Sequence, residues 1–207
     1  MFALRELCQQ VAVIPVLVVK ESQQAQPLAE ALVAGGLTVL EVTLRTPAAL
    51  EVIRLMSEVP GSQVGAGTVL TLADVKAAKA AGAQFAVSPG ATADLVKAAA
   101  DEGLPLLPGA STASEVMRLL ELGVDTLKFF PAEAAGGVAM LKSLYGPLPK
   151  VRFCPTGGIT EQTAANYLAL PNVMCVGGSW VTPDHLVQAG NWSAIQALAQ
   201  AAQALKV

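Results

Sequence analysis

Short apolar runs rich in β-branched residues recur along the whole chain, and alanine-rich stretches with helical periodicity separate them. The centres of successive runs lie roughly 20 to 25 residues apart, which suits one strand, one helix and two short loops. Such a regular alternation is typical of α/β folds with a parallel sheet. We predict strands near residues 13–19, 39–44, 63–66, 85–88, 104–107, 126–130, 151–154 and 173–176.

The stretches between these runs carry the end signals of helices. Gly82, Gly103 and Gly123 each come just before the next strand, where a left-handed glycine ends a helix. Thr71 and Thr92 stand where an N-cap belongs. We predict helices over residues 26–33, 47–58, 72–80, 93–101, 113–122, 162–168 and 193–205, and a short helix over 4–10 before the first strand.

Eight strands that alternate with helices can form a closed (β/α)8 barrel or an open doubly wound sheet. The first strand is not followed by the G-x-G-x-x-G pattern that a dinucleotide-binding sheet usually carries. Polar residues at the ends of strands are also spread around the series, which suits a ring. We therefore predict a single domain, residues 1–207, that folds as a (β/α)8 TIM barrel, with the first helix covering the barrel bottom.

The composition argues against several classes of protein. The net charge of −3 and the scattered basic residues indicate neither a nucleic-acid partner nor an acidic membrane surface. No apolar stretch spans a membrane without proline, glycine or charge, and the start of the chain lacks the pattern of a signal peptide. Cys8, Cys154 and Cys175 are far apart in apolar surroundings, which predicts reduced packing residues in a cytoplasmic protein.

Lys128 is the first candidate for chemistry, because it lies within an apolar run that is predicted to be a buried strand. A buried cation is costly. Burial favours the neutral amine of a lysine, which can attack a ketone and form a Schiff base. The alternative is a lysine near a strand end whose stem reaches water.

The alternation of side chains along a strand predicts which residues face the barrel interior. Glu41 and Arg45 share the face opposite Val42, and Lys128 lies opposite Leu127. The apolar faces must meet the outer helices, so the three charged side chains are predicted to point inward. Charged groups at the C-terminal ends of different strands are how barrel active sites are built. The alternative is a Glu41–Lys128 ion pair that only supports the barrel.

Two glycine pairs predict a phosphate site. Gly157 and Gly158 follow the seventh strand, and Gly177 and Gly178, with Ser179 after them, follow the eighth. The loops after these two strands are the usual phosphate site of such barrels, because glycines let backbone N–H groups approach the anion.

Small residues after the third and fourth strands suit the other end of a substrate. The hydroxyl of Thr68 could hold a carboxylate, Pro89 would wall the site, and Arg45 is the natural bidentate partner of a carboxylate. Two other polar residues are given no role. His185 is expected on a helix surface, and Glu133 is expected to be a solvated loop carboxylate.

Five motifs together resemble one known family, the 2-keto-3-deoxy-6-phosphogluconate (KDPG) aldolases. They occur in the family order and cover nearly the whole chain. The motifs are EVTLRT (41–46), GAGTVL (65–70), KFFPAE (128–133), FCPTGGI (153–159) and GGSW (177–180).

This resemblance implies a class I aldolase that cleaves KDPG to pyruvate and D-glyceraldehyde 3-phosphate, and often also 4-hydroxy-2-oxoglutarate to pyruvate and glyoxylate. It implies a cytoplasmic homotrimer of the Entner–Doudoroff pathway that needs no metal or other cofactor. Lys128 would form the Schiff base and Glu41 would be the general acid and base. The implied substrate-binding residues are Arg45, Thr68, Pro89, Phe130, Thr156, Gly157, Gly158, Gly178 and Ser179.

Three alternatives stay open at this point. A sister aldolase acts on 2-keto-3-deoxy-6-phosphogalactonate with the same chemistry and the opposite configuration at C4. A phosphate-binding barrel isomerase or synthase would use the same glycine loops without a Schiff base. A phosphosugar sensor without catalysis would need the phosphate loops alone.

Overall fold

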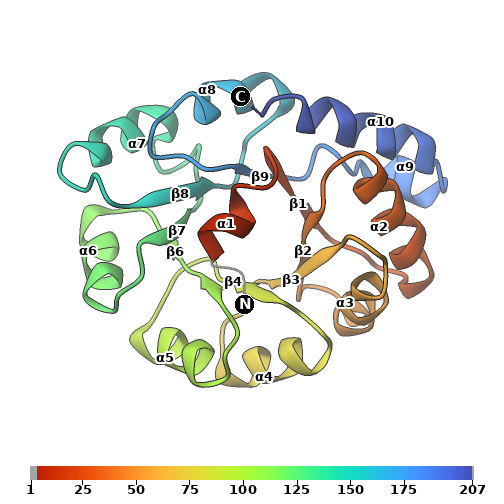
Figure 1. The fold of residues 1–207 in the computed structure, drawn as a ribbon, viewed down its shortest axis with the longest axis horizontal. Helices are drawn as coiled ribbons and strands as arrows, with labels where there is room; N and C mark the ends of the chain where they lie inside the picture. The colour runs from red at the N-terminus through yellow and green to blue at the C-terminus, as the bar shows by residue number, and fades with distance from the viewer. Residues whose placement is uncertain (1–3, 207) are drawn as a thin grey trace.

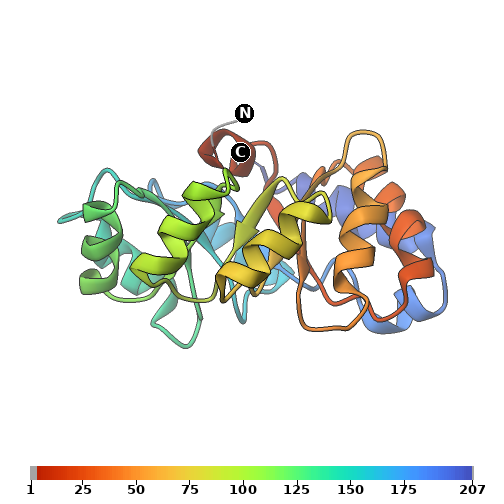
Figure 2. The ribbon, with the colours of Figure 1, turned by 90° about the horizontal axis from the view of Figure 1, so that it is seen from below.

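In the computed structural model, which describes residues 4–206, short parallel strands occupy the centre and helices surround them (Figure 1). Seen from the side, the helices lie roughly in one layer around the strands (Figure 2). The strands are β1 (Val13–Leu17), β2 (Val39–Thr43), β3 (Gln63–Gly67), β4 (Phe85–Val87), β5 (Leu106–Leu107), β6 (Gly109–Ala110), β7 (Thr126–Phe129), β8 (Arg152–Pro155) and β9 (Val176–Gly178).

The strands form two parallel sheets. A curled six-stranded sheet has the order β5-β4-β3-β2-β1-β9, and a three-stranded sheet has the order β6-β7-β8. Only Pro108 separates β5 from β6, and its missing N–H breaks the strand there. On the other side, single parallel bridges join Phe153 to Val173 and Thr156 to Gly177. The predicted α/β fold with a parallel sheet is confirmed.

The predicted helices are present in the predicted order, and the helix over residues 137–145 was not predicted. Thr71, Thr92 and Thr112 each accept the backbone N–H three residues on, as N-caps do. The helices are α1 (Leu4–Cys8), α2 (Ala25–Ala34), α3 (Ala49–Ser57), α4 (Leu72–Ala80), α5 (Ala93–Asp101), α6 (Ala113–Glu121), α7 (Gly137–Tyr145), α8 (Glu161–Leu168), α9 (Asp184–Gln188) and α10 (Trp192–Gln203), with a 3-10 turn at Ser22–Gln24. None of these helices is long and apolar enough to cross a membrane.

The core lies on both faces of the strands. Every residue of β2 is buried, and so is every residue of β7. The three cysteines are free and buried, as predicted, although they come from distant parts of the chain. Hydrogen bonds with Cys154 and Cys8, together with burial, raise the pKa of the Cys175 thiol well above its usual value. These thiols therefore belong to the packing of the core.

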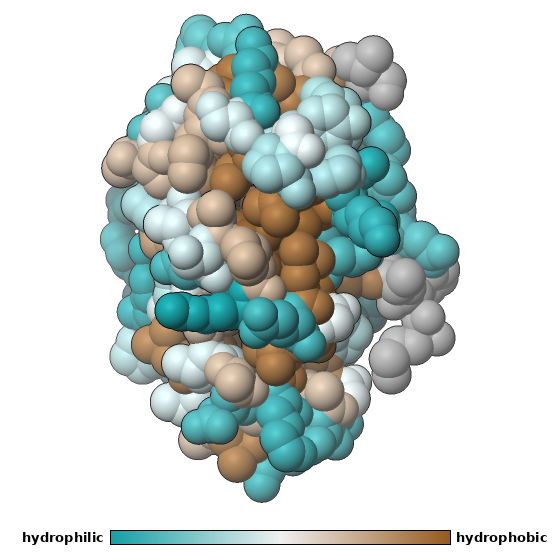
Figure 3. Space-filling model, turned by 90° about the vertical axis from the view of Figure 1, so that its left-hand side faces the viewer, coloured by the Kyte–Doolittle hydropathy of each residue, from teal (hydrophilic) through white to brown (hydrophobic). Residues whose placement is uncertain are grey.

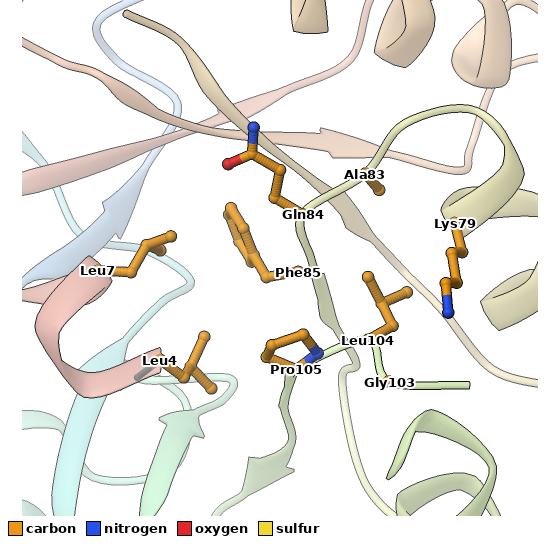
Figure 4. A pocket seen from close by; sticks show the side chains of 9 residues that line it. All are labelled: Leu4, Leu7, Lys79, Ala83, Gln84, Phe85, Gly103, Leu104 and Pro105. Atoms are coloured by element: carbon orange, nitrogen blue, oxygen red, sulfur yellow. The ribbon is translucent and has the colours of Figure 1, made fainter. Parts of the chain in front are cut away.

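The N-terminal ends of the strands lie against α1. Arg5 of this helix pairs with Asp125 at 2.9 Å and donates to the Thr126 hydroxyl at the start of β7. A cavity of about 290 Å³ lies beside α1, and Leu4, Leu7 and Phe85 are among the residues that line it (Figure 4). No residue of the predicted site lines this cavity. The candidate site is at the opposite ends of the strands.

Candidate active site at the C-terminal ends of the strands

Lys128 and Glu41 meet in the centre of the molecule. Lys128 lies on β7 and Glu41 on β2, and these two strands lie on opposite sides of the centre of the molecule (Figure 1). The Lys128 Nζ is 3.2 Å from the Glu41 Oε1. Lys128 is only 6% exposed and Glu41 only 3%. The structure therefore places an amine and a carboxylate in direct contact, away from bulk water.

Gly67 provides the space that the Glu41 carboxylate occupies. It ends β3, which pairs with β2, and a Cβ built on Gly67 would lie 2.3 Å from the Glu41 Oε1. Real atoms do not approach so closely, so any side chain at residue 67 would displace the carboxylate. The GAG sequence of β3 is therefore part of the site, although its glycines carry no chemistry.

Phe130 covers one side of the amine. Its ring lies in the turn after β7, with the ring centroid 5.3 Å from the Lys128 Nζ. This distance suits a cation–π contact when the amine is protonated. The same ring would be 3.4 Å from a Cβ on Gly157. Phe130 thus contacts both the amine and the first glycine after β8.

Arg45, Thr68 and Pro89 follow three neighbouring strands, β2, β3 and β4. Thr68 is half-buried and has a left-handed φ of +61°, which is uncommon for a residue with a side chain. Pro89 is also half-buried. Arg45 is exposed and lies in the turn after Thr43, where β2 ends, so the strand alternation from which its inward direction was predicted does not extend to it.

The two glycine pairs lie next to each other. Thr156 is buried at the end of β8 and bridges to Gly177 of β9. Gly157 and Gly158 have φ values of +106° and +79°, a region that favours glycine. Within residues 4–206, the backbone N–H groups of Gly157, Gly158 and Ser179 donate to no protein acceptor. Free backbone donors on adjacent loops are suited to an anion such as phosphate.

The family model for KDPG and KHG aldolases matches residues 4–198, almost the whole chain. The chain belongs to this aldolase family. Aldolases are lyases, and this family comprises class I pyruvate aldolases, so the resemblance found in the five motifs is confirmed.

Individual relatives support the same assignment. The KHG/KDPG aldolase of Escherichia coli (strain K12) is 52% identical over 92% of this chain and 90% of its own length. A crystal structure of the KDPG aldolase of Zymomonas mobilis with 3-phosphoglycerate has a TM-score of 0.92 and 53% identity, covering 97% of this chain and 95% of that one. The KDPG aldolase of Legionella pneumophila, with pyruvate captured as a covalent carbinolamine, has a TM-score of 0.94 and 48% identity over 98% of each chain.

One contact of this aldolase was not foreseen. Glu133 is exposed in a loop, as expected of a solvated carboxylate, and it also accepts a hydrogen bond from the hydroxyl of Tyr167 on α8. Tyr167 is only 1% exposed. A fully buried tyrosine needs a partner for its hydroxyl, and this general rule is the only signal in the sequence that could have indicated the contact.

Proposed function

We propose that this aldolase cleaves KDPG to pyruvate and D-glyceraldehyde 3-phosphate through a Schiff base on Lys128. The observation that carries the proposal is the buried contact of 3.2 Å between the Lys128 amine and the Glu41 carboxylate. An adjacent carboxylate can accept and return the protons that imine chemistry requires. The covalent pyruvate carbinolamine in the Legionella pneumophila relative supports the same chemistry.

The reaction begins when the neutral Lys128 Nζ attacks the C2 ketone of the substrate. The carbinolamine that forms loses water as Glu41 supplies a proton to the departing hydroxyl, and a protonated imine results. The C3–C4 bond then breaks. Its electron pair moves into the nitrogen-stabilised enamine, while Glu41 accepts the proton of the C4 hydroxyl, directly or through one water, and the aldehyde leaves.

Glu41 then returns a proton to C3 of the enamine, which becomes the imine of pyruvate. Addition of water to this imine releases pyruvate and frees the Lys128 amine for the next cycle. Because the imine withdraws electrons itself, the bond cleavage requires no metal to polarise the ketone. Glu41 lies beside the 2-keto acid end of the substrate and takes part in each of these proton transfers.

The remaining residues are proposed to hold the two anionic ends of the substrate. Arg45, Thr68 and Pro89 would surround the carboxylate, since they follow adjacent strands of one sheet. Free N–H groups suit the phosphate, and the 3-phosphoglycerate bound to the Zymomonas mobilis relative supports a phosphate-binding end. We propose four residues for the phosphate, namely Gly157, Gly158, Gly178 and Ser179. Thr156 would contact a substrate hydroxyl, and Phe130 would form one wall of the site.

A second activity on 4-hydroxy-2-oxoglutarate, giving pyruvate and glyoxylate, is proposed as well. The Escherichia coli relative is named for both activities. This substrate has the same 2-keto acid end and lacks the phosphate, so it would use Lys128 and Glu41 and leave the glycine loops unused.

The finer structural expectations are also proposals. We propose that the two sheets form one closed (β/α)8 barrel with α1 covering its N-terminal end. Pro108 connects the sheets on one side, and the bridges Phe153–Val173 and Thr156–Gly177 connect them on the other. We further propose a cytoplasmic homotrimer acting in the Entner–Doudoroff pathway. Figure 3 supports an oligomer, since hydrophobic side chains form a band on the face over α6 and α7.

Borohydride reduction of the protein in the presence of pyruvate tests the proposal. Reduction of the imine fixes pyruvate to the amine, and peptide mass spectrometry locates the adduct. We expect one adduct, on Lys128, and none in Lys128→Ala. A folded wild-type protein that gives no adduct would favour an isomerase or synthase without a Schiff base.

A separate comparison of two substrates tests for the sister activity on 2-keto-3-deoxy-6-phosphogalactonate. The ratio of kcat/KM for the gluconate and galactonate epimers shows which C4 configuration the enzyme prefers. We expect the gluconate epimer to be preferred, in line with the names of the relatives. Equal or reversed values would assign the chain to the galactonate activity.

A further inference from the structure

The loop after β7 and the loop after β8 are bonded along their main chains. We call residues 130–136 the β7 loop and residues 156–160 the phosphate loop. The N–H of Ala132 donates to the carbonyl of Thr156 at 2.8 Å, and the N–H of Glu133 donates to the carbonyl of Gly157 at 3.1 Å. The path of the β7 loop therefore determines the path of the phosphate loop.

The side chain of Glu133 also packs against the phosphate loop. A Cβ built on Gly158 would lie 2.8 Å from both the Cβ and the Cγ of Glu133. The backbone of Gly158 is therefore in close contact with the glutamate stem. A movement of this side chain would change the direction in which the free N–H of Gly158 points.

Tyr167 holds Glu133 in this position. Its hydroxyl donates to the Glu133 Oε1, and a Cβ built on Gly137 would lie 3.0 Å from the same hydroxyl. Burial and the Glu133 carboxylate raise the pKa of Tyr167 far above its usual value, so the hydroxyl remains a donor at every working pH. Tyr167 belongs to α8, which begins directly after the phosphate loop.

We propose that the hydrogen bond between Tyr167 and Glu133 positions the free N–H groups of the phosphate loop for the phosphate of the substrate. This inference rests on the proposed function, because it concerns the same phosphate end. Neither side chain touches the reacting atoms. Both are positioning residues, and they act through Gly157 and Gly158.

Tyr167→Phe removes one hydroxyl and tests the inference. We expect KM for KDPG to rise about three- to tenfold, the effect of roughly one hydrogen bond, with kcat nearly unchanged. Cleavage of 4-hydroxy-2-oxoglutarate, which has no phosphate, should keep its kcat/KM. Tyr145→Phe is the matched control, because Tyr145 is partly exposed at the end of α7. This variant should leave the kinetic constants for both substrates unchanged.

Variants of the acceptor keep the test decisive if Tyr167→Phe folds poorly. Glu133→Ala removes the acceptor and should reproduce the rise in KM. Glu133→Gln retains an oxygen that accepts the tyrosine hydroxyl, and it should restore KM to within about twofold of the wild type. An equal rise in both glutamate variants would show that the bond is not responsible, which overturns the inference.

Titration with inorganic phosphate separates this inference from the proposed reaction. We expect phosphate to bind the wild type several-fold more tightly than Tyr167→Phe, with equal melting temperatures and equal pyruvate adducts. Equal phosphate binding by the two proteins, or no phosphate binding by the wild type, overturns the inference. A missing pyruvate adduct in the wild type would remove the proposed reaction, while the phosphate comparison would still decide this inference.

Discussion

At the scale of single residues, the central feature is a buried ion pair, and removing either of its members would destabilise the fold. Glu41 and Lys128 are both almost fully buried, and each is the ion-pair partner of the other. Removing one partner of a buried pair leaves an uncompensated charge, which costs roughly 3 to 5 kcal/mol. The amine and the carboxylate that we propose to be catalytic thus also contribute to the stability of the fold as a pair.

Lys128→Ala should abolish turnover and lower the free energy of unfolding by about 3 kcal/mol, because Glu41 loses its partner. Adding Glu41→Gln to this variant removes the orphaned charge and should recover most of that stability without recovering activity. Urea denaturation and steady-state kinetics measure the two effects. Lys142→Ala on the exposed face of α7 is the control and should change neither. Substantial turnover by Lys128→Ala would rule out the Schiff base.

Gly67→Ala should slow turnover by at least about tenfold, because the new Cβ would displace the Glu41 carboxylate from the amine, and small misplacements of catalytic groups are costly. The loss should appear in kcat. Gly146→Ala is the matched control, since a Cβ there meets no atom within 4 Å. Equal kcat values for the two variants would mean that the position of Glu41 is not critical.

Strand alternation was sufficient to place Glu41 and Lys128 correctly, because both lie inside strands where side chains alternate strictly. It does not apply to Arg45, because the chain leaves β2 two residues earlier. The contact between Glu133 and Tyr167 could not be predicted beyond the general rule that a buried tyrosine hydroxyl needs a partner. It depends on the path of two loops, and no local pattern determines that path.

At the scale of elements, glycine and proline explain where prediction succeeded and where it did not. The alternation of strands and helices was predicted because its caps and periodicity are local signals. The helix α7 was not predicted, since its N-cap Gly136 and its first residue Gly137 are both at positive φ and resemble a loop. The break between β5 and β6 follows from Pro108, but periodicity alone does not show it.

The capping box of α6 is the element that we expect to respond to pH. Glu115 accepts the backbone N–H groups of Ser111 and Thr112, and these bonds hold its pKa below the ordinary value of 4.5. A carboxyl group with a lowered pKa stabilises the fold above its unfolded value, and this contribution is lost as the pH falls through its folded value.

Glu115→Gln should therefore lower the free energy of unfolding at pH 7 by about 0.5 to 1 kcal/mol, the low end for a cap because Glu115 is exposed. Chemical denaturation at pH 7 and again well below pH 4.5 measures the change. At the low pH the variant and the wild type should be equally stable. Glu121→Gln, at the other end of α6, should cost nothing at either pH. A difference that persists in acid would assign the effect to packing.

At the scale of the whole molecule, the surface over α6 and α7 carries exposed apolar side chains. Figure 3 shows hydrophobic side chains in a band on this face. Met117 of α6 is 54% exposed, and Leu122 at the end of that helix is 45% exposed. Exposed apolar bands of this kind usually mark contacts with other chains.

Sedimentation equilibrium should therefore give about three times the mass of one chain, in line with the proposed homotrimer. Met117→Lys should shift the population towards smaller species if the band over α6 and α7 is buried between subunits, because a buried unpaired charge is costly. Ala80→Lys, which adds the same single charge to an exposed residue of α4, is the control for charge alone. A wild-type protein that sediments as a monomer at all concentrations would contradict the homotrimer.

The division of the strands into two sheets has a consequence for any attempt to split the gene. Cutting the chain at Pro108 would leave Glu41 on one fragment and Lys128 on the other. Each fragment would then carry a lone charge on a strand that should be buried, in addition to its open sheet edges. Neither piece could bind pyruvate covalently and shuttle its protons, so the enzyme would exist only where the two fragments reassemble. Complementation between co-expressed halves would thus report directly on whether the two halves bring Glu41 and Lys128 together again.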